Sequence, residues 1–203
     1  MTDPLFITPE NSTRASIRKI IRTKRQALTS TFQNNAAEML LLTLKDDCKV
    51  KRSQHIALYL ANDGELDLQP FIDWCWQKNK HVYLPVLHPF CPGNLLFLLY
   101  ERDSTMIKNH LGIFEPKLAV NKVCPLEKLD LLFTPLVAFD CTGARLGMGG
   151  GFYDRTLANW RQHKLIPIGL AHDCQQVDSI PVENWDIPLP KIITPNFTFN
   201  FPP

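Results

Sequence analysis

Hydrophobic positions along this chain form two kinds of pattern, spacings of three and four residues and short continuous runs. Together these patterns predict helices that alternate with buried strands. Apolar side chains recur at spacings of three and four in three segments, which predicts amphipathic helices at residues 12–28, 30–43 and 68–79. Ser30 and Gln33 have the spacing of a capping box at the start of the second helix. Short apolar runs predict buried strands at residues 55–60, 81–87, 95–100, 131–139, 166–171 and 191–194. This alternation predicts an α/β fold with a mostly parallel sheet covered on both faces.

Three other features refine that picture. Proline inside the runs 81–87 and 166–171 indicates edge strands or early strand ends, because proline cannot donate a hydrogen bond to a neighbouring strand. Residues 101–128 are charged, carry prolines and show little pattern, which predicts a long excursion, over a ligand, rather than regular structure. A chain of 203 residues is most simply a single domain, 1–203. We expect residues 1–10 and 196–203 to be loose ends.

The stretch 130–157, DLLFTPLVAFDCTGARLGMGGGFYDRTL, combines a buried strand, a glycine cluster and a helix start. Four of the chain's nine glycines fall within the five positions 147–151. Glycines allow a backbone to approach an anion closely, and the start of a helix favours negative charge. Arg145 adds a planar donor that is always charged. This layout predicts a phosphate site.

The pattern leaves other interpretations open. It is neither the dinucleotide fingerprint nor a P-loop, because no Lys-Ser or Lys-Thr follows the glycines. The glycines also fit a plain tight turn between a strand and a helix. Asp154, in the first turn of the predicted helix, fits either a helix cap or a ligand of Mg²⁺ beside a phosphate.

Charged residues supply two further candidates. Between residues 11 and 37 there are six basic residues and no acid, and Arg14, Arg18 and Arg22 recur every four positions on one side of the predicted helix. Such a stripe is either a solvated face or a cradle for phosphates. Glu65 lies in a turn after the strand 55–60, where α/β proteins usually bind ligands, although taken alone it fits an ordinary surface residue.

Composition excludes several classes of protein. Hydrophobic residues make up 45% and charged residues 21% of the chain, and the net charge of +2 is too small to indicate nucleic-acid or membrane binding. No apolar run reaches the roughly 20 residues that a bilayer span requires. The first ten residues lack the pattern of a secretion signal. Six cysteines without a C-x-x-C pair indicate reduced thiols and a cytoplasmic location.

The string RLGMGGGFYDRTL, preceded by TPLVAFD, closely resembles the signature of the 5-formyltetrahydrofolate cyclo-ligases, and the resemblance covers nearly the whole chain. It implies a three-layer α/β/α sandwich of Rossmann-like type and a role in one-carbon metabolism. The family converts 5-formyltetrahydrofolate and ATP to 5,10-methenyltetrahydrofolate, ADP and phosphate. Phosphorylation of the formyl oxygen lets N10 attack the carbon and phosphate leave. The resemblance thus implies Mg²⁺ and ATP, and we expect a monomer with no nucleic-acid or membrane partner.

The resemblance also assigns roles to single residues. It implies that ATP is bound by Arg14, Arg18, Arg145, Leu146, Gly147, Met148, Gly149, Gly150, Gly151, Phe152 and Tyr153. It implies that the folate is bound by Leu60, Glu65, Met148, Gly149, Gly150, Gly151 and Phe152. It implies that Mg²⁺ is held by Asp154 and Asp186, and that Arg145 and Tyr153 act in catalysis.

The chain departs from the family pattern at three places. Many members have Lys where Arg14 stands, and some relatives have Lys where Gly150 stands, so charge on the transferred phosphate must rest on Arg145 and the metal. The sequence around Asp186 differs from much of the family, which leaves a plain turn aspartate as the alternative there. Two other functions fit the residues: a sugar-phosphate isomerase or acyl-transferase relative that uses no ATP, or a non-catalytic nucleotide-sensing or nucleic-acid-binding protein that uses the arginine stripe.

Overall fold

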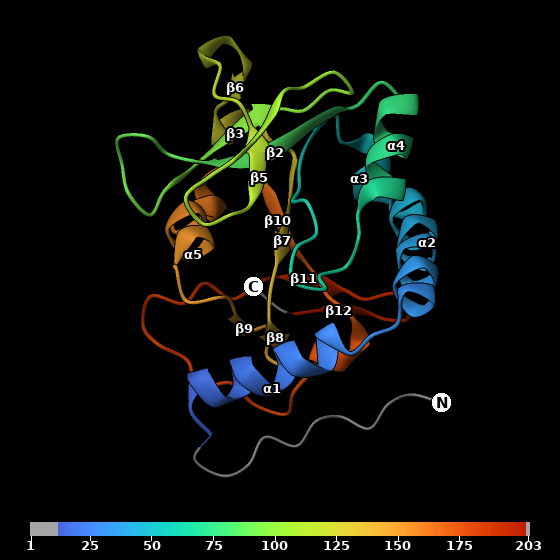
Figure 1. The fold of residues 1–203 in the computed structure, drawn as a ribbon, viewed down its shortest axis with the longest axis vertical. Coiled ribbons are helices and arrows are strands. Elements are labelled where there is room, and N and C mark those ends of the chain that lie inside the picture. Colours follow the sequence, from blue (N-terminus) through green and yellow to red (C-terminus); the bar gives the residue numbers. More distant parts are fainter. Residues whose placement is uncertain (1–11, 202–203) are drawn as a thin grey trace.

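The computed structural model describes residues 12–201, and an eight-stranded sheet forms its centre (Figure 1). The strand order is β12-β11-β10-β7-β1-β2-β3-β6. These strands are β1 (His55–Ala57), β2 (His81–Leu87), β3 (Leu95–Leu99), β6 (Val123–Cys124), β7 (Leu131–Pro135), β10 (Ile166–Leu170), β11 (Lys191–Ile193) and β12 (Thr198–Asn200). The strands from β11 to β2 are parallel, and antiparallel strands complete both margins. The predicted mostly parallel sheet is confirmed.

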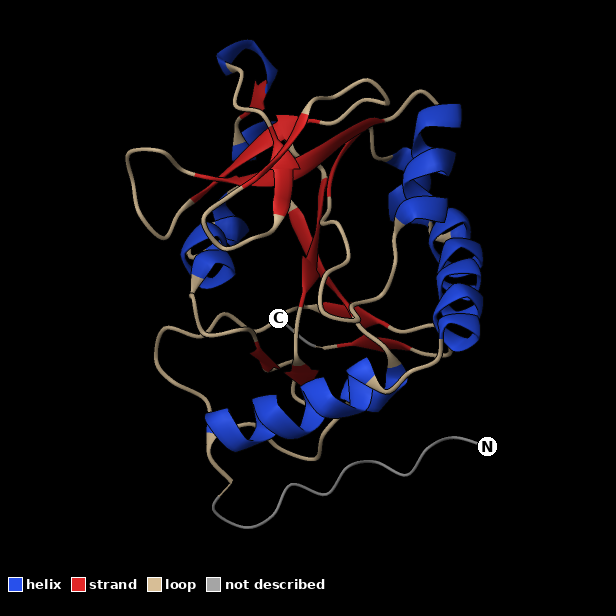
Figure 2. Cartoon of the chain, in the orientation of Figure 1, coloured by secondary structure: helices blue, strands red, loops and turns tan. Residues whose placement is uncertain are grey.

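Helices cover both faces of this sheet. The α-helices are α1 (Arg14–Gln26), α2 (Ser30–Asp46), α3 (Cys48–Arg52), α4 (Gln69–Gln77) and α5 (Phe152–Leu157). Figure 2 shows α2, α3 and α4 on one side of the sheet and α5 on the other, in the orientation labelled in Figure 1. Leu40 and Phe71 pack with Phe133 on the first face, and Leu157 packs with Leu132 on the second. The three-layer α/β/α architecture is therefore confirmed.

Shorter elements lie outside the main sheet. Two small antiparallel sheets pair β4 (Met106–Lys108) with β5 (Phe114–Pro116) and β8 (Ala138–Phe139) with β9 (Arg145–Leu146). The 3-10 helices are η1 (Val120–Lys122), η2 (Leu126–Lys128), η3 (Trp160–Gln162) and η4 (Asp173–Gln175). The 101–128 segment is thus more ordered than its weak pattern predicts, since it supplies a hairpin and the edge strand β6.

Helix α1 belongs to neither layer and runs across the lower end of the molecule (Figure 1). Thr13 caps it by accepting a hydrogen bond from the backbone N–H of Ser16. Its apolar side chains Ile17 and Ile21 are fully buried, and they pack with Val137 and Leu146 around the β8–β9 sheet. Because β1, β7 and β10 are parallel, their carboxyl ends share one edge of the sheet, and the loops that leave this edge approach α1.

Two local expectations about strands and caps are wrong. Thr29, rather than Ser30, caps α2 by accepting from the N–H of Phe32. The prolines in β2 and β10 lie in interior strands and do not mark edges. Pro85 lies beyond Tyr83, the last residue of β2 that pairs with β1, and Pro167 lies before the first residue of β10 that pairs with β11. Each proline therefore falls where one neighbouring strand is absent, which removes the need for its N–H.

The expectation of a loose C-terminal end is also wrong for residues 196–201. Strand β12 pairs antiparallel with β11, and Phe199 contacts Phe139 with ring centroids 5.3 Å apart. Residues 1–10, the other expected loose end, lie outside the described part of the chain. Within residues 12–201, no helix has both the length and the apolar character needed to cross a membrane.

Candidate active site

The glycine loop, residues 147–151, joins β9 to α5 at the carboxyl edge of the sheet. Gly149 and Gly151 have φ values of +99° and +65°, a backbone region that L-residues rarely adopt, so these two positions favour glycine. Nothing lies within 4 Å of a Cβ built on Gly147, and the side chain of Met148 is 55% exposed. Helix α5 has only six residues, so its dipole is weak and the loop's own N–H groups must supply most of the attraction for an anion.

Arg18 reaches the glycine loop from the middle of α1. Its Nε donates to the carbonyl oxygen of Gly147 at 2.7 Å. Its guanidinium lies 3.7 Å from the position that a Cβ would occupy if Gly149 were replaced by a larger residue. Burial, and secondarily the charge of Arg14, lower the pKa of Arg18. The structure thus brings α1 to the predicted phosphate loop, although in this state Arg18 binds a loop carbonyl.

Two arginine–carboxylate pairs lie beside the loop. Arg14 donates to both carboxylate oxygens of Asp186, and its Nη2 lies 2.9 Å from Oδ1. Arg145, which is only 4% exposed, donates from Nη2 to Oδ1 of Asp154 at 2.8 Å. The two pairs are neighbours, because the N–H of Ile187 donates to Asp154 at 3.3 Å. Residues predicted to bind ATP and metal from four separate segments therefore form one cluster.

The pKa values of this cluster follow from burial opposed by pairing. Burial disfavours the ionised form of Asp186, but hydrogen bonds from Arg14 and from the N–H of Glu183 outweigh it and lower the pKa of Asp186. Burial lowers the pKa of Arg145, while the charge of Asp154 opposes that change. Among the described residues, Nε of Arg145 is buried without an acceptor. An anionic ligand would supply the acceptor that this donor lacks.

The carboxylates suit a metal ion that is held jointly with phosphate. Within residues 12–201, no three His, Cys, Asp or Glu side chains gather as a metal cage of protein ligands would require. Mg²⁺ does not need such a cage, since it usually takes one or two carboxylates together with substrate phosphates and water. Asp154 and Asp186 would provide the two carboxylates, and Asp186 would exchange Arg14 for the ion.

Glu65 and Tyr153 define a second, more apolar region that adjoins the first. Burial raises the pKa of Glu65 to about 7, and the positive charge of Arg25, with which Glu65 forms an ion pair at 4.0 Å, only partly opposes this. Burial raises the pKa of Tyr153, with a further contribution from Glu65, so the phenol stays protonated. Tyr153 is also close enough to Arg145 to feel its charge. Tyr153 thus links the carboxylate of Glu65 to the arginine beside the glycine loop.

Sequence reasoning missed the residues that hold the turn carrying Glu65. Asp63, with φ of +52°, accepts hydrogen bonds from Nε of Arg22 at 2.7 Å and from Nη2 of Arg25 at 2.8 Å, and Gln26 donates to it as well. Arg25 is fully buried and also donates from Nε to the Asp63 carbonyl. The available signal was helical spacing, which places Arg25 four residues after Ile21 on the buried stripe of α1.

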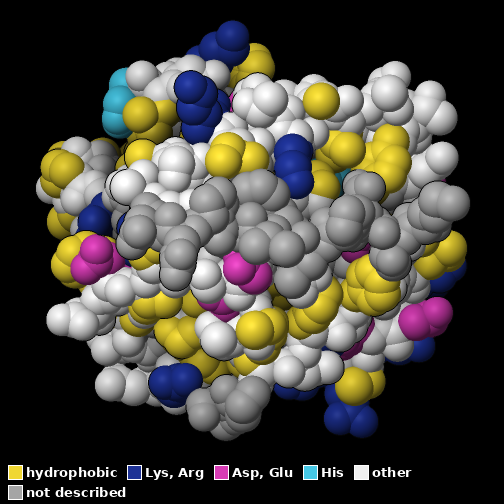
Figure 3. All heavy atoms as spheres, turned by 90° about the horizontal axis from the view of Figure 1, so that it is seen from below, with side chains coloured by type: hydrophobic (Ala, Val, Ile, Leu, Met, Phe, Trp, Pro, Cys, Tyr) yellow, Lys and Arg dark blue, Asp and Glu magenta, His cyan; other side chains and the backbone are white. Residues whose placement is uncertain are grey.

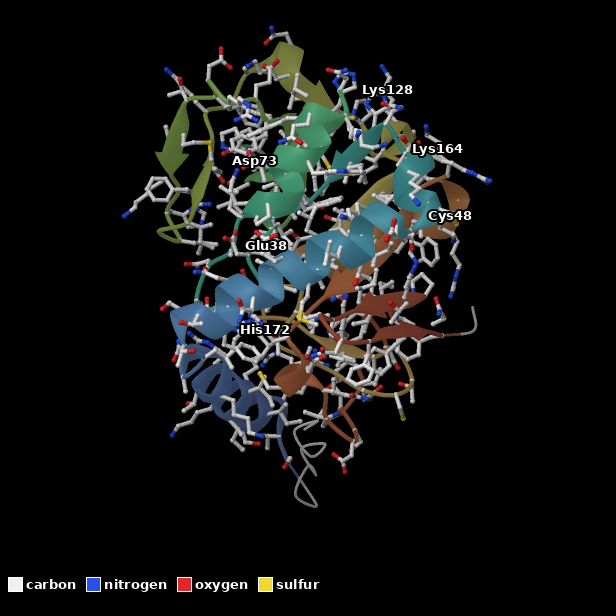
Figure 4. The ribbon with its side chains drawn as sticks, turned by 90° about the vertical axis from the view of Figure 1, so that its right-hand side faces the viewer. Glu38, Cys48, Asp73, Lys128, Lys164 and His172 are labelled. Atoms are coloured by element: carbon white, nitrogen blue, oxygen red, sulfur yellow. The ribbon has the colours of Figure 1, made fainter. Side chains whose placement is uncertain are left out.

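His172 lies against this network, just after the end of β10. Figure 4 shows His172 between α1 and the start of α2, and its ring centroid lies 6.1 Å from that of Phe32. Its side chain is fully buried. Burial, together with the nearby charge of Arg25, lowers the pKa of His172 to about 4, so the imidazole is neutral at physiological pH. It therefore adds no second cation beside Arg25.

The remaining predicted residues have different surroundings. Leu60 follows β1 and stays partly exposed while it packs against the core between the sheet and helices α2 and α4. Leu146 is fully buried against α1, so only its backbone is available to a nucleotide. Phe152 lies partly exposed at the start of α5.

The basic stripe of α1 is not an isolated charged surface. Arg14 and Arg22 form ion pairs with Asp186 and Asp63, and Arg18 binds the Gly147 carbonyl. Figure 3 shows that on the lower face, among the atoms drawn in colour, Lys and Arg side chains are scattered between hydrophobic and uncharged groups. The stripe thus connects α1 to the glycine loop and to the turns that carry Asp186 and Asp63.

The sequence model of the 5-formyltetrahydrofolate cyclo-ligase family matches residues 10–195. The chain belongs to this family. The 5-formyltetrahydrofolate cyclo-ligase of Escherichia coli K12 is 53% identical over 177 residues, which cover 87% of this chain and 97% of that protein. The enzyme of the same name from Haemophilus influenzae is 51% identical over 180 residues, with 89% and 96% coverage. The resemblance read from the RLGMGGGFYDRTL string is confirmed.

Solved structures of the family have the same fold. The NMR structure of Aquifex aeolicus 5,10-methenyltetrahydrofolate synthetase covers 92% of both chains with a TM-score of 0.79 and 28% sequence identity. A 5,10-methenyltetrahydrofolate synthetase from Mycoplasma pneumoniae, at 22% identity and a TM-score of 0.72, shows the fold alone. Both sequence and fold thus support membership of the cyclo-ligase family.

Proposed function

We propose that this cyclo-ligase family member converts 5-formyltetrahydrofolate to 5,10-methenyltetrahydrofolate and uses Mg·ATP to activate the formyl group. A formamide carbonyl is unreactive because the nitrogen lone pair is delocalised into it, and hydroxide is a poor leaving group. Transfer of the γ-phosphoryl group to the formyl oxygen makes the carbon electrophilic and provides phosphate as the leaving group. N10 of the folate then closes the ring without an enzymic nucleophile.

The chain's own residues would mainly position the reactants and neutralise charge, as is usual in phosphoryl transfer. The N–H groups of residues 147–151 and the guanidinium of Arg145 would face the γ-phosphoryl group. Arg14 would bind the remaining phosphates once Asp186 exchanges it for the metal, and Arg18 would bind them through its Nη nitrogens while its Nε keeps the Gly147 carbonyl. Bound Mg²⁺, held by Asp154 and Asp186, would neutralise phosphate charge.

The folate would occupy the region between Glu65 and the loop. The carboxylate of Glu65 suits a pterin, whose 2-amino group and adjacent ring N–H offer two parallel donors. Leu60 and Phe152 would give apolar contact to the ring. The protonated phenol of Tyr153 would donate a hydrogen bond toward the formyl oxygen and orient it.

One observation carries this proposal: Arg145 is buried beside the open glycine loop, and one of its donors has no acceptor among the described residues. Burying such a guanidinium is costly unless an anion binds there during function. This observation favours an anionic phosphate ligand at the loop over a simple turn.

The test is formation of the methenyl product, followed by its near-ultraviolet absorbance. Wild-type protein with Mg·ATP and 5-formyltetrahydrofolate should give the absorbance rise, and Arg145→Ala should lower kcat/KM by about a hundredfold or more. Arg161→Ala is the matched control, since Arg161 lies exposed over the Trp160 ring. A wild-type rise that needs no ATP would contradict the role of ATP, and no rise at all would defeat the proposal.

A further inference from the structure

Arg155 lies in α5, just after the glycine loop, and its side chain folds back over that loop. Its Nη2 donates to the carbonyl oxygen of Gly150, and its Nε donates to the carbonyl oxygen of Gly93 at 2.6 Å. The guanidinium also lies over the Phe152 ring, 5.7 Å from the centroid. Gly93 belongs to the turn between β2 and β3, so one exposed side chain connects two loops that are far apart in sequence.

The contact with Gly150 determines where a neighbouring N–H points. A trans peptide is planar, so the N–H of Gly151 points away from the Gly150 carbonyl that Arg155 holds. Arg18 acts in the same way at the start of the loop, where its bond to the Gly147 carbonyl orients the N–H of Met148. The two arginines come from different helices and hold the loop by carbonyls near its two ends. They leave the loop's N–H groups directed elsewhere and available to an anion.

The fit around Arg155 is close. A Cβ on Gly93 would lie 2.5 Å from Nη2 of Arg155, and a Cβ on Gly151 would lie 2.8 Å from Nη1. Both glycines also have positive φ values, +84° and +65°. Both glycines leave room for the guanidinium, and their positive φ values favour glycine independently of Arg155. The two hydrogen bonds and the contact with the Phe152 ring are what distinguish Arg155 from a freely rotating surface side chain.

We propose that Arg155 is a positioning residue, which orders the glycine loop and directs its N–H groups toward the terminal phosphates of the nucleotide. The inference rests on the proposed function for the identity of the ligand. Arg155 itself binds two carbonyls and need not touch the substrate. The turn between β2 and β3 becomes part of the support of the phosphate site, because it provides the second anchor of the guanidinium.

The experiment compares Arg155→Ala and Arg155→Lys with wild type, and uses Arg161→Ala as the control. The first measurement is the NMR order parameter of the amides of Gly149, Gly150 and Gly151 without any ligand. We expect values of about 0.85 in wild type and below about 0.6 in Arg155→Ala. This readout does not depend on the reaction.

The second measurement separates nucleotide binding from folate binding. In Arg155→Ala, the KM for Mg·ATP should rise by about tenfold or more, because hydrogen bonds from a charged donor are lost, while the KM for 5-formyltetrahydrofolate should stay within about twofold. Arg155→Lys should recover little, since an ammonium group cannot donate in two fixed directions. Free guanidinium at a non-denaturing concentration should partly restore the KM for Mg·ATP in Arg155→Ala.

The outcomes distinguish the two proposals. Unchanged loop order in Arg155→Ala, or a more mobile loop with an unchanged KM for Mg·ATP, would overturn the role of Arg155. An equal rise of both KM values together with a lower thermal midpoint would also overturn it, as this is the result of a general loss of stability. If wild type binds no nucleotide although its loop order depends on Arg155, the proposed function fails and the loop contact stands.

Discussion

Arg14 and Asp186 form a two-point ion pair that ties the first residue of α1 to a turn near the end of the chain. The N–H of Glu183 donates to the same carboxylate at 2.8 Å. Both terminal nitrogens of Arg14 are therefore engaged in this state. A phosphate of the nucleotide can bind Arg14 only if another cation takes the place of Arg14 at Asp186. We therefore expect phosphate and metal to bind here together.

Asp186→Asn tests this exchange, because asparagine keeps the shape of the side chain and removes its charge. We expect the half-saturating Mg²⁺ concentration to rise by about tenfold or more, since a metal ligand has lost its charge. A Mg²⁺ titration of methenyl formation at fixed ATP measures it. Glu183→Gln is the matched control, because it removes the same charge from the same turn. Equal effects of the two substitutions would indicate general electrostatics instead of ligation.

Asp154→Ala is expected to destabilise the fold as well as to lower activity. It leaves the buried guanidinium of Arg145 without its only charged hydrogen-bond partner among the described residues. Loss of one member of a buried pair costs about 3 kcal/mol of unfolding free energy. Removal of both members in Asp154→Ala/Arg145→Met should recover part of this loss. Urea unfolding measures both, and a double variant no more stable than Asp154→Ala would contradict the pairing.

Glu65→Gln is expected to change how stability depends on pH. Burial raises the pKa of Glu65 to about 7 from its ordinary value of 4.5. Between these pH values the folded state binds more protons than the unfolded state, so the wild-type free energy of unfolding falls as pH rises. Glutamine removes this loss. The unfolding free energy of the variant relative to wild type should therefore rise by about 1–3 kcal/mol between pH 4.5 and pH 7. Above pH 7 this difference should stay constant.

The same substitution should weaken folate binding, since a neutral amide cannot match two donors as a carboxylate does. The wild-type kcat/KM for 5-formyltetrahydrofolate should fall as pH drops below about 7, as Glu65 becomes protonated. In Glu65→Gln this dependence should be absent, and the KM should exceed that of wild type above pH 7 and approach it well below pH 7. A wild-type profile that stays flat through pH 7 would contradict the assignment.

Asp63→Asn is expected to loosen the turn that carries Glu65. The hydrogen bond from Arg22 is the main cause that lowers the pKa of Asp63 to about 2, from 3.8. A lowered pKa stabilises the folded state above the unfolded value, and that contribution is lost as pH falls toward 2. The variant should lose about 2 kcal/mol at pH 7, and the difference from wild type should vanish near pH 2. The KM for the folate should rise more than the KM for Mg·ATP.

Asp130→Asn is a suitable control for Asp63→Asn. Asp130 accepts backbone hydrogen bonds from Gln54 and His55 and pairs with Lys164 at 2.8 Å. Like Asp63, it therefore joins separate segments through several hydrogen bonds. Figure 4 shows Lys164 well away from His172 and the α1 network. Its replacement should lower stability without changing either KM. A similar rise of the folate KM in both variants would remove the special role of Asp63.

Periodicity and a motif were enough to predict the sheet, its helices and the loop, because these depend on local patterns. The run 81–87 coincides with β2, since the strand is buried or half-buried from Val82 to Leu87. The run 55–60 overestimates β1, which ends at Ala57 because its pairing with β7 ends there. The length of a strand thus depends on where its neighbouring strands end. A local sequence pattern does not contain that information.

The sequence assigned roles to single residues only through the family resemblance, and it did not predict which of those residues contact one another. The contact between Arg25 and Asp63 joins segments 38 positions apart, and that between Arg14 and Asp186 joins segments 172 apart. Nothing local marks which arginine of a basic helix faces inward, except that Arg25 continues the stripe of Ile17 and Ile21. The position of α1 across the end of the sheet likewise depends on the small β8–β9 sheet, whose two-residue strands give no periodic signal.

Helix α1 therefore makes two separate sets of contacts, one with each half of the helix. Its first half meets the turn at Asp186 and the glycine loop, and its second half meets the turn at Asp63. Grafting this helix from a homologue would succeed only if both receiving turns were transplanted with it. Directed evolution for a new nucleotide or a new folate analogue should accordingly yield compensating changes in pairs, one in α1 and one in the turn it meets.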